Sequence, residues 1–371
     1  MTDSSLSKAG KKFEQETGFS WPVAFWGLIN CFTPQYDPND FAYRTNWTIR
    51  DNVNNSHYEN IKYMHSSLPL TVVENCIVFR EAFSARWVRE LFEKKATIDI
   101  LSYGCGTGGD LLGLIYALHF SNLTGKHLRI YALDGNEDAL RKCQIMMGYT
   151  NHFRGLGNSI EFHPIQFRTI VGQTEADTRF GTPRLGNMKF DIILTSKCLN
   201  ELVKQNIDIY NYFLNRIVNP FLRNKGLALI LDIAELRSMT YMEDKSLDLW
   251  TTQVLSQSVS RFRACHPDFH ILLPFPCDHC PDCSCGYSAT YYQLPLKEKN
   301  SQKPYSQALC YRLLIRSELP NKGREIDRLL NSHNFITVRR RTLPPTECCP
   351  KKRNKMGADL DGYKMIEAWK R

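Results

Sequence analysis

Three alternating glycines, Gly104, Gly106 and Gly108, come directly after a short apolar run at residues 98–101. Glycine tolerates positive φ angles and has no Cβ, so a ligand can approach the backbone of such a turn closely. A second apolar run, residues 128–133, ends in Asp134. A carboxylate at the end of the second strand can accept hydrogen bonds from both hydroxyls of a ribose. Together these residues predict a cleft that binds a nucleoside.

The elements that would position these residues are strands of a covered parallel sheet and the helices between them. Short apolar runs with little alternation are typical of strands that are buried on both faces. Asp110 and the following Leu-Leu-Gly-Leu open a helix whose amino end faces the ligand. Further strands are expected at residues 159–166, 189–195, 227–233, 306–316 and 334–342, and helices at residues 58–95, 207–218 and 323–330.

This combination resembles the class I S-adenosylmethionine-dependent methyltransferases, whose first motif reads (D/E)-x-G-x-G-x-G. The resemblance implies an α/β fold with a Rossmann-like seven-stranded sheet and S-adenosyl-L-methionine as cofactor. Ser102 stands where the family has an acid, and Asp99 and Asp110 are the candidates to replace it. Gly109 also completes a G-x-G-x-x-G spacing, so a dinucleotide-binding domain is the nearest alternative. No dehydrogenase catalytic set follows it.

The resemblance also implies a set of cofactor-binding residues at the strand ends. The loop of residues 104–108 would hold the methionine part, Asp134 the ribose, and Gln166 the adenine amino group. The full expected set is Tyr103, Gly104, Cys105, Gly106, Thr107, Gly108, Asp110, Asp134, Gly135, Asn136, Gln166 and Ser196.

Residues after the fourth strand would face the acceptor. Ser196, Asn200 and Glu201 are the catalytic candidates, and Lys197 is a further candidate for orienting the acceptor. A base is needed only for an acceptor that must lose a proton, and Glu201 or a histidine from the Cys-rich cap could serve. The same segment could equally begin a helix whose leucines point inward. No Asn/Asp-Pro-Pro-aromatic motif is present, which argues against transfer to the exocyclic nitrogen of adenine.

A cysteine cluster is the second chemical signal: Cys277, Cys280, Cys283 and Cys285. In a chain without a secretory signal, such spacing indicates a metal site, with zinc as the default. An iron-sulfur cluster and an unliganded loop are the alternatives. The residues that could complete a site are Cys265, His266, His270, His279 and Cys310. The cluster is loosely similar to the C-P-H-D-x-x-C-P motif of methyltransferase-like proteins of mitochondrial small-ribosomal-subunit assembly.

Length and charge suggest additions to a methyltransferase core of about 200 residues. The chain has 371 residues and a net charge of +9, with basic runs at residues 339–341 and 351–355. Such runs attract polyanions, serve as a nuclear address or form a solvated tail. No apolar run approaches the roughly 18 residues of a membrane span. The amino terminus lacks a signal sequence, so we expect the cytoplasm or the nucleus.

We therefore expect five regions: 1–95, an aromatic and helical extension or lid; 96–240, the cofactor-binding core; 241–305, a Cys-rich cap; 306–345, the terminal strands; and 346–371, a basic tail. Tyr58, Tyr63 and Arg80 are candidate lid residues. The expected function is methylation of RNA or another macromolecule, such as a protein. The alternatives are a non-catalytic scaffold that binds RNA or protein and a small-molecule methyltransferase.

Overall fold

A computed structural model describes part of the chain. The described residues are 57–152, 156–166, 169–170, 179–180, 185–200, 208–233, 236–242, 245–273, 289–297 and 304–317. Several expected features lie outside these residues: the catalytic candidate Glu201, the cysteines Cys277, Cys280, Cys283 and Cys285, His279, the elements expected at residues 323–330 and 334–342, and the basic runs.

The main sheet has the strand order β10-β12-β7-β6-β1-β2-β3, and β11 adds to it by pairing with β12. The strands are β1 (Thr97–Tyr103), β2 (His127–Asp134), β3 (Ser159–Gln166), β6 (Phe190–Ser196), β7 (Leu222–Ile233), β10 (Phe269–Leu273), β11 (Ala289–Lys297) and β12 (Pro304–Arg316). The five neighbouring strands β7, β6, β1, β2 and β3 are parallel to one another. Only β12 reverses direction, because it is antiparallel to β7 and to β10.

This topology separates the two fold alternatives. Numbered along the chain, the path reads 3-2-1-4-5-7-6, with the seventh strand reversed. A dinucleotide-binding sheet has the order 3-2-1-4-5-6 and lacks the inserted reversed strand. The fold is therefore α/β and Rossmann-like, with the seven-stranded sheet of a methyltransferase. The expected strands at residues 98–101, 128–133, 159–166 and 189–195 are confirmed, since each coincides with β1, β2, β3 or β6 within a few residues.

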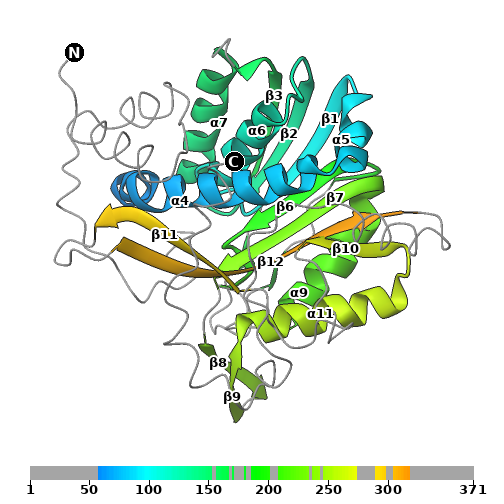
Figure 1. Ribbon diagram of the computed structural model, residues 1–371. Coiled ribbons are helices and arrows are strands. Elements are labelled where there is room, and N and C mark those ends of the chain that lie inside the picture. Colours follow the sequence, from blue (N-terminus) through cyan, green and yellow to red (C-terminus); the bar gives the residue numbers. More distant parts are fainter. Residues whose placement is uncertain are drawn as a thin grey trace.

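Helices cover both faces of the sheet, which explains why all seven residues of β6 are buried (Figure 1). One apolar core joins the sheet to α4 (His57–Ser84), α5 (Arg86–Glu93), α6 (Gly109–Phe120) and α7 (Glu137–His152). The other core joins it to α9 (Ile209–Phe213), the π-helical turn η4 (Leu214–Val218) and α11 (Thr251–Cys265). The short elements are α10 (Asn219–Phe221), β4 (Thr169–Ile170), β5 (Arg179–Phe180), β8 (Leu236–Met242) and β9 (Lys245–Trp250). No helix among the described residues is long and apolar enough to span a membrane.

One strand of the main sheet lies inside the segment that the sequence predicts to be a cap. Residues 241–305 contain α11 and β10, and β10 pairs with β12 at the edge of the sheet. The predicted boundary at residue 241 is therefore wrong for residues 251–273, which belong to the core. The local pattern could not show this, because β10 has five residues and its partner comes much later in the chain.

The start of β7 also differs from expectation. The sequence predicts a turn before residue 227, whereas β7 begins at Leu222, which pairs with Phe190. The next pair is Ile192 with Leu227, so β7 bulges between the two contacts. Lys225 has a φ of 62° within this bulge. The Asn-Lys-Gly sequence that indicates a turn therefore forms an irregularity within a strand.

Helix α4 packs closely on α6 because two glycines let the backbones approach. A Cβ at Gly113 would lie 2.5 Å from the carbonyl oxygen of Val72 and 2.7 Å from the Cβ of Asn75. A Cβ at Gly109, one turn earlier, would lie 3.1 Å from the Cβ of Thr71. Residues 71–75 of α4 are thereby held beside the start of α6, which is the helix that follows the glycine loop.

We expect Gly113→Ala to destabilise the protein, by about 1–3 kcal/mol, because the added methyl would force two helix backbones apart. Urea denaturation measures this free energy of unfolding. Gly148→Ala is the matched control: Gly148 also lies in a helix, and a Cβ there meets nothing within 4 Å. This control should stabilise the protein slightly, as alanine favours helix more than glycine. Equal effects of the two variants would contradict the close packing.

Candidate cofactor site

The glycine loop lies between the ends of β1 and β2. The backbone N–H groups of Gly104 and Cys105 both donate to the carbonyl oxygen of Leu133, at 2.8 and 3.0 Å. Gly104, Gly106 and Gly108 have φ angles of 71°, 51° and 92°. These positive angles are costly for residues with a Cβ, which explains the alternating glycines.

The three glycines serve different purposes. A Cβ at Gly104 would collide with the Cys198 thiol, and one at Gly108 would lie 2.7 Å from the Sγ of Cys143. These two positions therefore require glycine, because a side chain would prevent the loop from packing against Cys198 and Cys143. A Cβ at Gly106 meets nothing within 4 Å. Gly106 is thus the point at which the loop backbone faces open space and can accept a ligand.

Asp134 lies at this point of the loop, as the sequence predicts. Its Oδ2 accepts a hydrogen bond from the backbone N–H of Gly106 at 2.6 Å, and its Oδ1 accepts one from the N–H of Asn136 at 2.8 Å. Burial raises the pKa of this carboxyl, and the backbone hydrogen bonds oppose that shift. The carboxylate and the glycine loop therefore form one site at neighbouring strand ends.

Asp110 is the acid that approaches the position normally acidic in the first motif. Ser102, the residue at that position, donates its hydroxyl hydrogen to Oδ2 of Asp110 at 2.5 Å. Asp110 is buried in the first turn of α6, and its Oδ1 accepts the N–H of Leu111 at 2.8 Å. Burial raises the pKa of Asp110 to about 7, although these hydrogen bonds oppose the shift.

The other candidate, Asp99, has a different role. Its carboxylate accepts two hydrogen bonds from Arg129, at 2.6 and 2.9 Å, and forms an ion pair with Arg223 at 2.7 Å. Asp99 lies near the start of β1, whereas the glycine loop follows its end. Of the two predicted substitutes for the missing acid, only Asp110 is brought to the site.

Helix α4 contacts both sides of the site. Beside Asp134, Nδ2 of Asn60 donates to Oδ1 of Asn136 at 3.2 Å and to Oδ2 of Asp138 at 2.8 Å. At the end of β6, Oδ1 of Asn75 accepts the hydroxyl of Ser196 at 2.9 Å. The sequence reading missed Asn60 and Asn75. The signal that could have found them is the occurrence of polar residues within the predicted buried stripe of the helix.

The residues that follow β6 are tightly held. Lys197 has a φ of 57°, its N–H donates to the carbonyl of Leu231 at 2.7 Å, and its ammonium forms an ion pair with Glu74 of α4 at 2.7 Å. Glu74 is fully buried, and burial raises its pKa while Lys197 opposes the shift. Asn200 is buried, and Leu199 packs in the core as the helical reading predicts.

Two more predicted residues flank the loop and the acid. Gln166 ends β3, is exposed, and lies opposite Asp134 in the strand register. Thr107 is buried, and its hydroxyl has no hydrogen-bond partner among the described residues. This unpaired hydroxyl and the open space at Gly106 are what a site for an extended, polar nucleoside cofactor requires. The residues present therefore fit S-adenosylmethionine.

The remaining predicted residues have mixed placements. Cys105 is buried, and Tyr103 is buried with a pKa raised by burial. Arg80, a predicted lid residue, lies over the Phe120 ring at the far end of α6. The side chain of Tyr58 is outside the described set. Among the described residues no group of three His, Cys, Asp or Glu side chains could hold a metal ion. That set includes the proposed partners Cys265, His266, His270 and Cys310.

The strand order, the loop and the acid together form a candidate cofactor site at the strand ends of a Rossmann-like sheet. Neither the protein-family models nor the curated proteins contain a significant match. Among solved structures the chain is similar to the plantazolicin methyltransferase BpumL, with 16% identity, a TM-score of 0.38 and coverage of 85% of this chain and 100% of that chain.

Two further solved structures are similar at the same level. An S-adenosylmethionine-dependent methyltransferase from Clostridium acetobutylicum has 12% identity and a TM-score of 0.30, covering 64% of this chain and 92% of that one. Phosphoethanolamine N-methyltransferase 1 from Haemonchus contortus has 11% identity and a TM-score of 0.33, covering 78% and 55%. These similarities concern architecture, and the fold assignment here rests on the strand order.

Proposed function

We propose that this chain is an S-adenosylmethionine-dependent methyltransferase. The observation that carries the proposal is the 2.6 Å hydrogen bond between the Asp134 carboxylate and the N–H of Gly106, the loop residue that faces open space. This hydrogen bond holds the acid that would bind the ribose beside a stretch of backbone that a ligand can approach closely. Both lie at neighbouring strand ends, which is where open α/β sheets bind their ligands.

Each part of the cofactor has a matching group in the chain. The glycine loop would hold the methionine part, and the carboxylate of Asp110 would accept its ammonium group. Asp134 would bind the ribose hydroxyls, and Gln166 the adenine amino group. When bound, the cofactor supplies a methyl group on a sulfonium to a nucleophilic acceptor atom. The residues of the chain orient the reactants and exclude water around them.

The acceptor we propose is RNA or another macromolecule. The net charge of +9 and the late basic runs support a polyanionic partner. Ser196, Asn200 and Glu201 would orient the acceptor atom after β6. Zinc at the four clustered cysteines and a cytoplasmic or nuclear location stay predictions from the sequence.

A non-catalytic scaffold is the second candidate function. The observation that favours it is that both oxygens of Asp134 already accept backbone N–H groups, so ribose binding must share them. Isothermal titration of the full chain with S-adenosylmethionine separates the two candidates, because a scaffold that has lost the cofactor shows no heat of binding. Incubation with methyl-labelled cofactor and cell extract then tests whether RNA, protein or small molecules become labelled.

We expect cofactor affinity to rise with pH until about pH 7 and then to level off. The ammonium of the cofactor needs the ionised form of Asp110, whose pKa is raised to about 7. Below that pH one proton must leave on binding, so the dissociation constant should fall about tenfold per pH unit. Without cofactor, the free energy of unfolding should decrease as pH rises to about 7. The protonated form of Asp110 stabilises the folded state, and this contribution is lost as the carboxyl ionises. Titrations across this range measure both slopes.

Asp110→Asn is the matched variant for this pH dependence. It keeps the size of the side chain and one acceptor oxygen, replaces the other oxygen with an NH₂ donor, and cannot ionise. The variant should bind the cofactor weakly and with no pH dependence near neutrality. A slope that persists in Asp110→Asn would assign the titration to another group, such as Asp134, and would contradict the role proposed for Asp110.

A further inference from the structure

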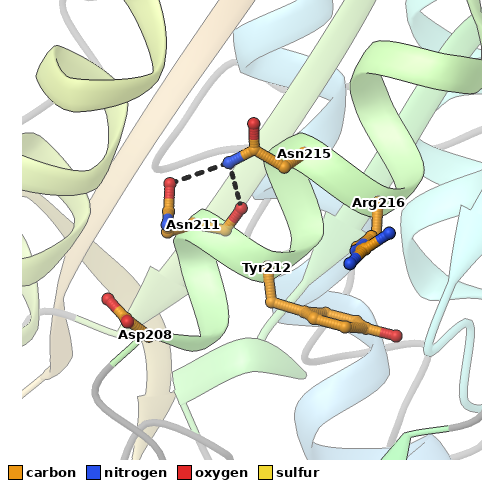
Figure 2. Close-up of a pocket in the computed structure, with 5 residues that line it drawn as sticks. All are labelled: Asp208, Asn211, Tyr212, Asn215 and Arg216. Atoms are coloured by element: carbon orange, nitrogen blue, oxygen red, sulfur yellow. Dashed lines mark hydrogen bonds between the residues drawn. The ribbon is translucent and has the colours of Figure 1, made fainter.

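A hollow lies on one side of α9 and η4, away from the residues of the cofactor site. It has a volume of about 270 Å³ and is lined by Asp208, Asn211, Tyr212, Asn215 and Arg216 (Figure 2). Their spacing of three and four residues places all five on one face of the helical segment. Pockets for drug-sized ligands have volumes of about 300 Å³ or more, so this hollow is large enough for one small molecule or one unit of a polymer.

The lining separates into two edges. In Figure 2 the carboxamides of Asn211 and Asn215 lie along the upper left edge of this face, and Tyr212 and Arg216 lie along its lower right edge. Nδ2 of Asn215 donates to both the carbonyl oxygen and Oδ1 of Asn211 at 2.8 Å, and its Oδ1 lies 3.2 Å from Nε2 of His266. Asn215 is thereby fixed and binds Oδ1 of Asn211, while the NH₂ group of Asn211 has no hydrogen-bond partner among the described residues.

Arg216 is exposed at the opposite edge. Its guanidinium forms neither an ion pair nor a hydrogen bond with another described residue, unlike Arg223 and Arg316, which are both paired. Tyr212 is half-buried beside it. A planar aromatic ring, the NH₂ group of a carboxamide and a cation without a polar partner among the described residues therefore line one small hollow.

The helical segment that lines the hollow is linked to the glycine loop by packing contacts between core residues. The ring of Phe213 packs edge-on against Tyr103, the last residue of β1, with centroids 5.3 Å apart. Tyr212 and Cys198 both lie close enough to the Tyr103 hydroxyl to raise its pKa further, after burial. Cys198 in turn contacts Gly104 of the loop. The segment also contains a π-helical turn, a distortion that is frequent at functional sites.

We propose that this hollow binds one nucleoside monophosphate unit, either free or within single-stranded RNA. The proposal rests on the methyltransferase function above and names a site for its acceptor outside the cofactor loop. Tyr212 would stack on the base, Asn211 would hydrogen-bond to the base edge, and Arg216 would contact the phosphate. Asp208 would accept an exocyclic amino group. An acidic peptide fits less well, because it would use Arg216, be repelled by Asp208 and leave the ring of Tyr212 without a partner.

The test uses the full chain and a labelled single-stranded oligoribonucleotide, with binding followed by fluorescence anisotropy at several salt concentrations. Arg216→Ala should weaken binding about tenfold and reduce the salt slope by about 0.7, the value for one phosphate contact. Arg86→Ala is the control for general charge, because Arg86 is exposed on α5 in the opposite helical layer. It should leave the slope nearly unchanged. Equal losses in the two variants would overturn the proposal.

Tyr212 gives a second, independent readout. Tyr212→Leu should weaken binding about 5-fold or more, because it removes a stacking surface, whereas Tyr212→Phe should retain binding. Equal affinities of the two variants would also overturn the assignment.

Direct titration with each of the four nucleoside monophosphates tests whether the ligand is a free nucleotide. Saturable binding that Arg216→Ala removes supports a free nucleotide, and binding of the oligomer alone supports a single strand of RNA. An acidic peptide that displaces the oligomer with the same dependence on Arg216 would overturn the nucleotide assignment.

Cofactor binding distinguishes this proposal from the methyltransferase proposal. Arg216→Ala should bind S-adenosylmethionine as the unaltered chain does, because no hydrogen bond or ion pair joins Arg216 to a described residue of the cofactor site. If the unaltered chain fails to bind S-adenosylmethionine, the methyltransferase proposal fails whatever the RNA result. If it binds the cofactor and Arg216 has no effect on nucleotide binding, the hollow alone is wrongly assigned.

Discussion

Asp134→Ala should abolish measurable binding of S-adenosylmethionine, with an affinity loss of about 100-fold or more. The substitution removes the carboxylate proposed to bind the ribose, and hydrogen bonds to a charged group each contribute about 1.5–3 kcal/mol. It also leaves the N–H groups of Gly106 and Asn136 without their acceptor, so the loop loses its present conformation. Isothermal titration at neutral pH measures the loss.

Two comparisons isolate this effect from a general loss of structure. Asp134→Asn retains one oxygen for the loop but not the charge, so it should bind the cofactor more weakly than the unaltered chain and more tightly than Asp134→Ala. Glu90→Gln removes an exposed carboxylate on α5 and should bind normally. Thermal unfolding of each variant checks the fold. Retention of full affinity in Asp134→Ala would contradict the site described here.

Lys197→Met should destabilise the protein by about 3–5 kcal/mol, because it leaves a buried charge without a partner. The ammonium of Lys197 is 2.7 Å from Oε2 of Glu74, and both side chains are buried between α4 and the end of β6. Urea denaturation near neutral pH measures the change. The pair attaches α4 to the segment at the end of β6, so we also expect the variant to loosen the contact between Ser196 and Asn75.

The pH dependence of this variant has a defined sign. Burial already raises the pKa of Glu74, and losing Lys197 raises it further. A carboxyl whose pKa is raised on folding favours the folded state below its unfolded pKa, and that contribution disappears as pH increases. Stability of Lys197→Met should therefore fall more steeply with pH than that of the unaltered chain. The double variant Glu74→Met/Lys197→Met should recover most of the loss. If the double variant does not recover this stability, the destabilisation of Lys197→Met does not come from the unpaired carboxylate of Glu74.

The strands and the loop of the site could be predicted from local sequence patterns. Buried strands such as β1 and β6 are continuous apolar runs because both faces are covered, and the loop between β1 and α6 requires glycine at its positive φ angles. Asp134 could be placed because an acid at a strand end is a local feature. Gln166 was predicted from the family resemblance alone, and the parallel register of β2 and β3 in the structure places it opposite Asp134.

Other parts of the site depend on contacts between distant segments. Which of Asp99 and Asp110 replaces the missing acid was undecided in the sequence, since both lie close to Ser102 in the chain. The structure decides it: Asp99 meets Arg129 and Arg223, whereas Asp110 turns back to Ser102. The place of β10 in the sheet was likewise hidden, because its pairing with β12 joins segments far apart in sequence.

By itself the sequence determined the α/β class, the glycine loop and the acid that ends the second strand. Each of these depends on backbone conformation or on apolar periodicity within a few neighbouring residues. Only the tertiary structure decided that α4 reaches both sides of the site through Asn60 and Asn75, and that Arg216 and Tyr212 border one hollow. The physical reason is that a polar side chain in a helix carries no local sign of its partner. Its partner is set by how the helices pack on the sheet.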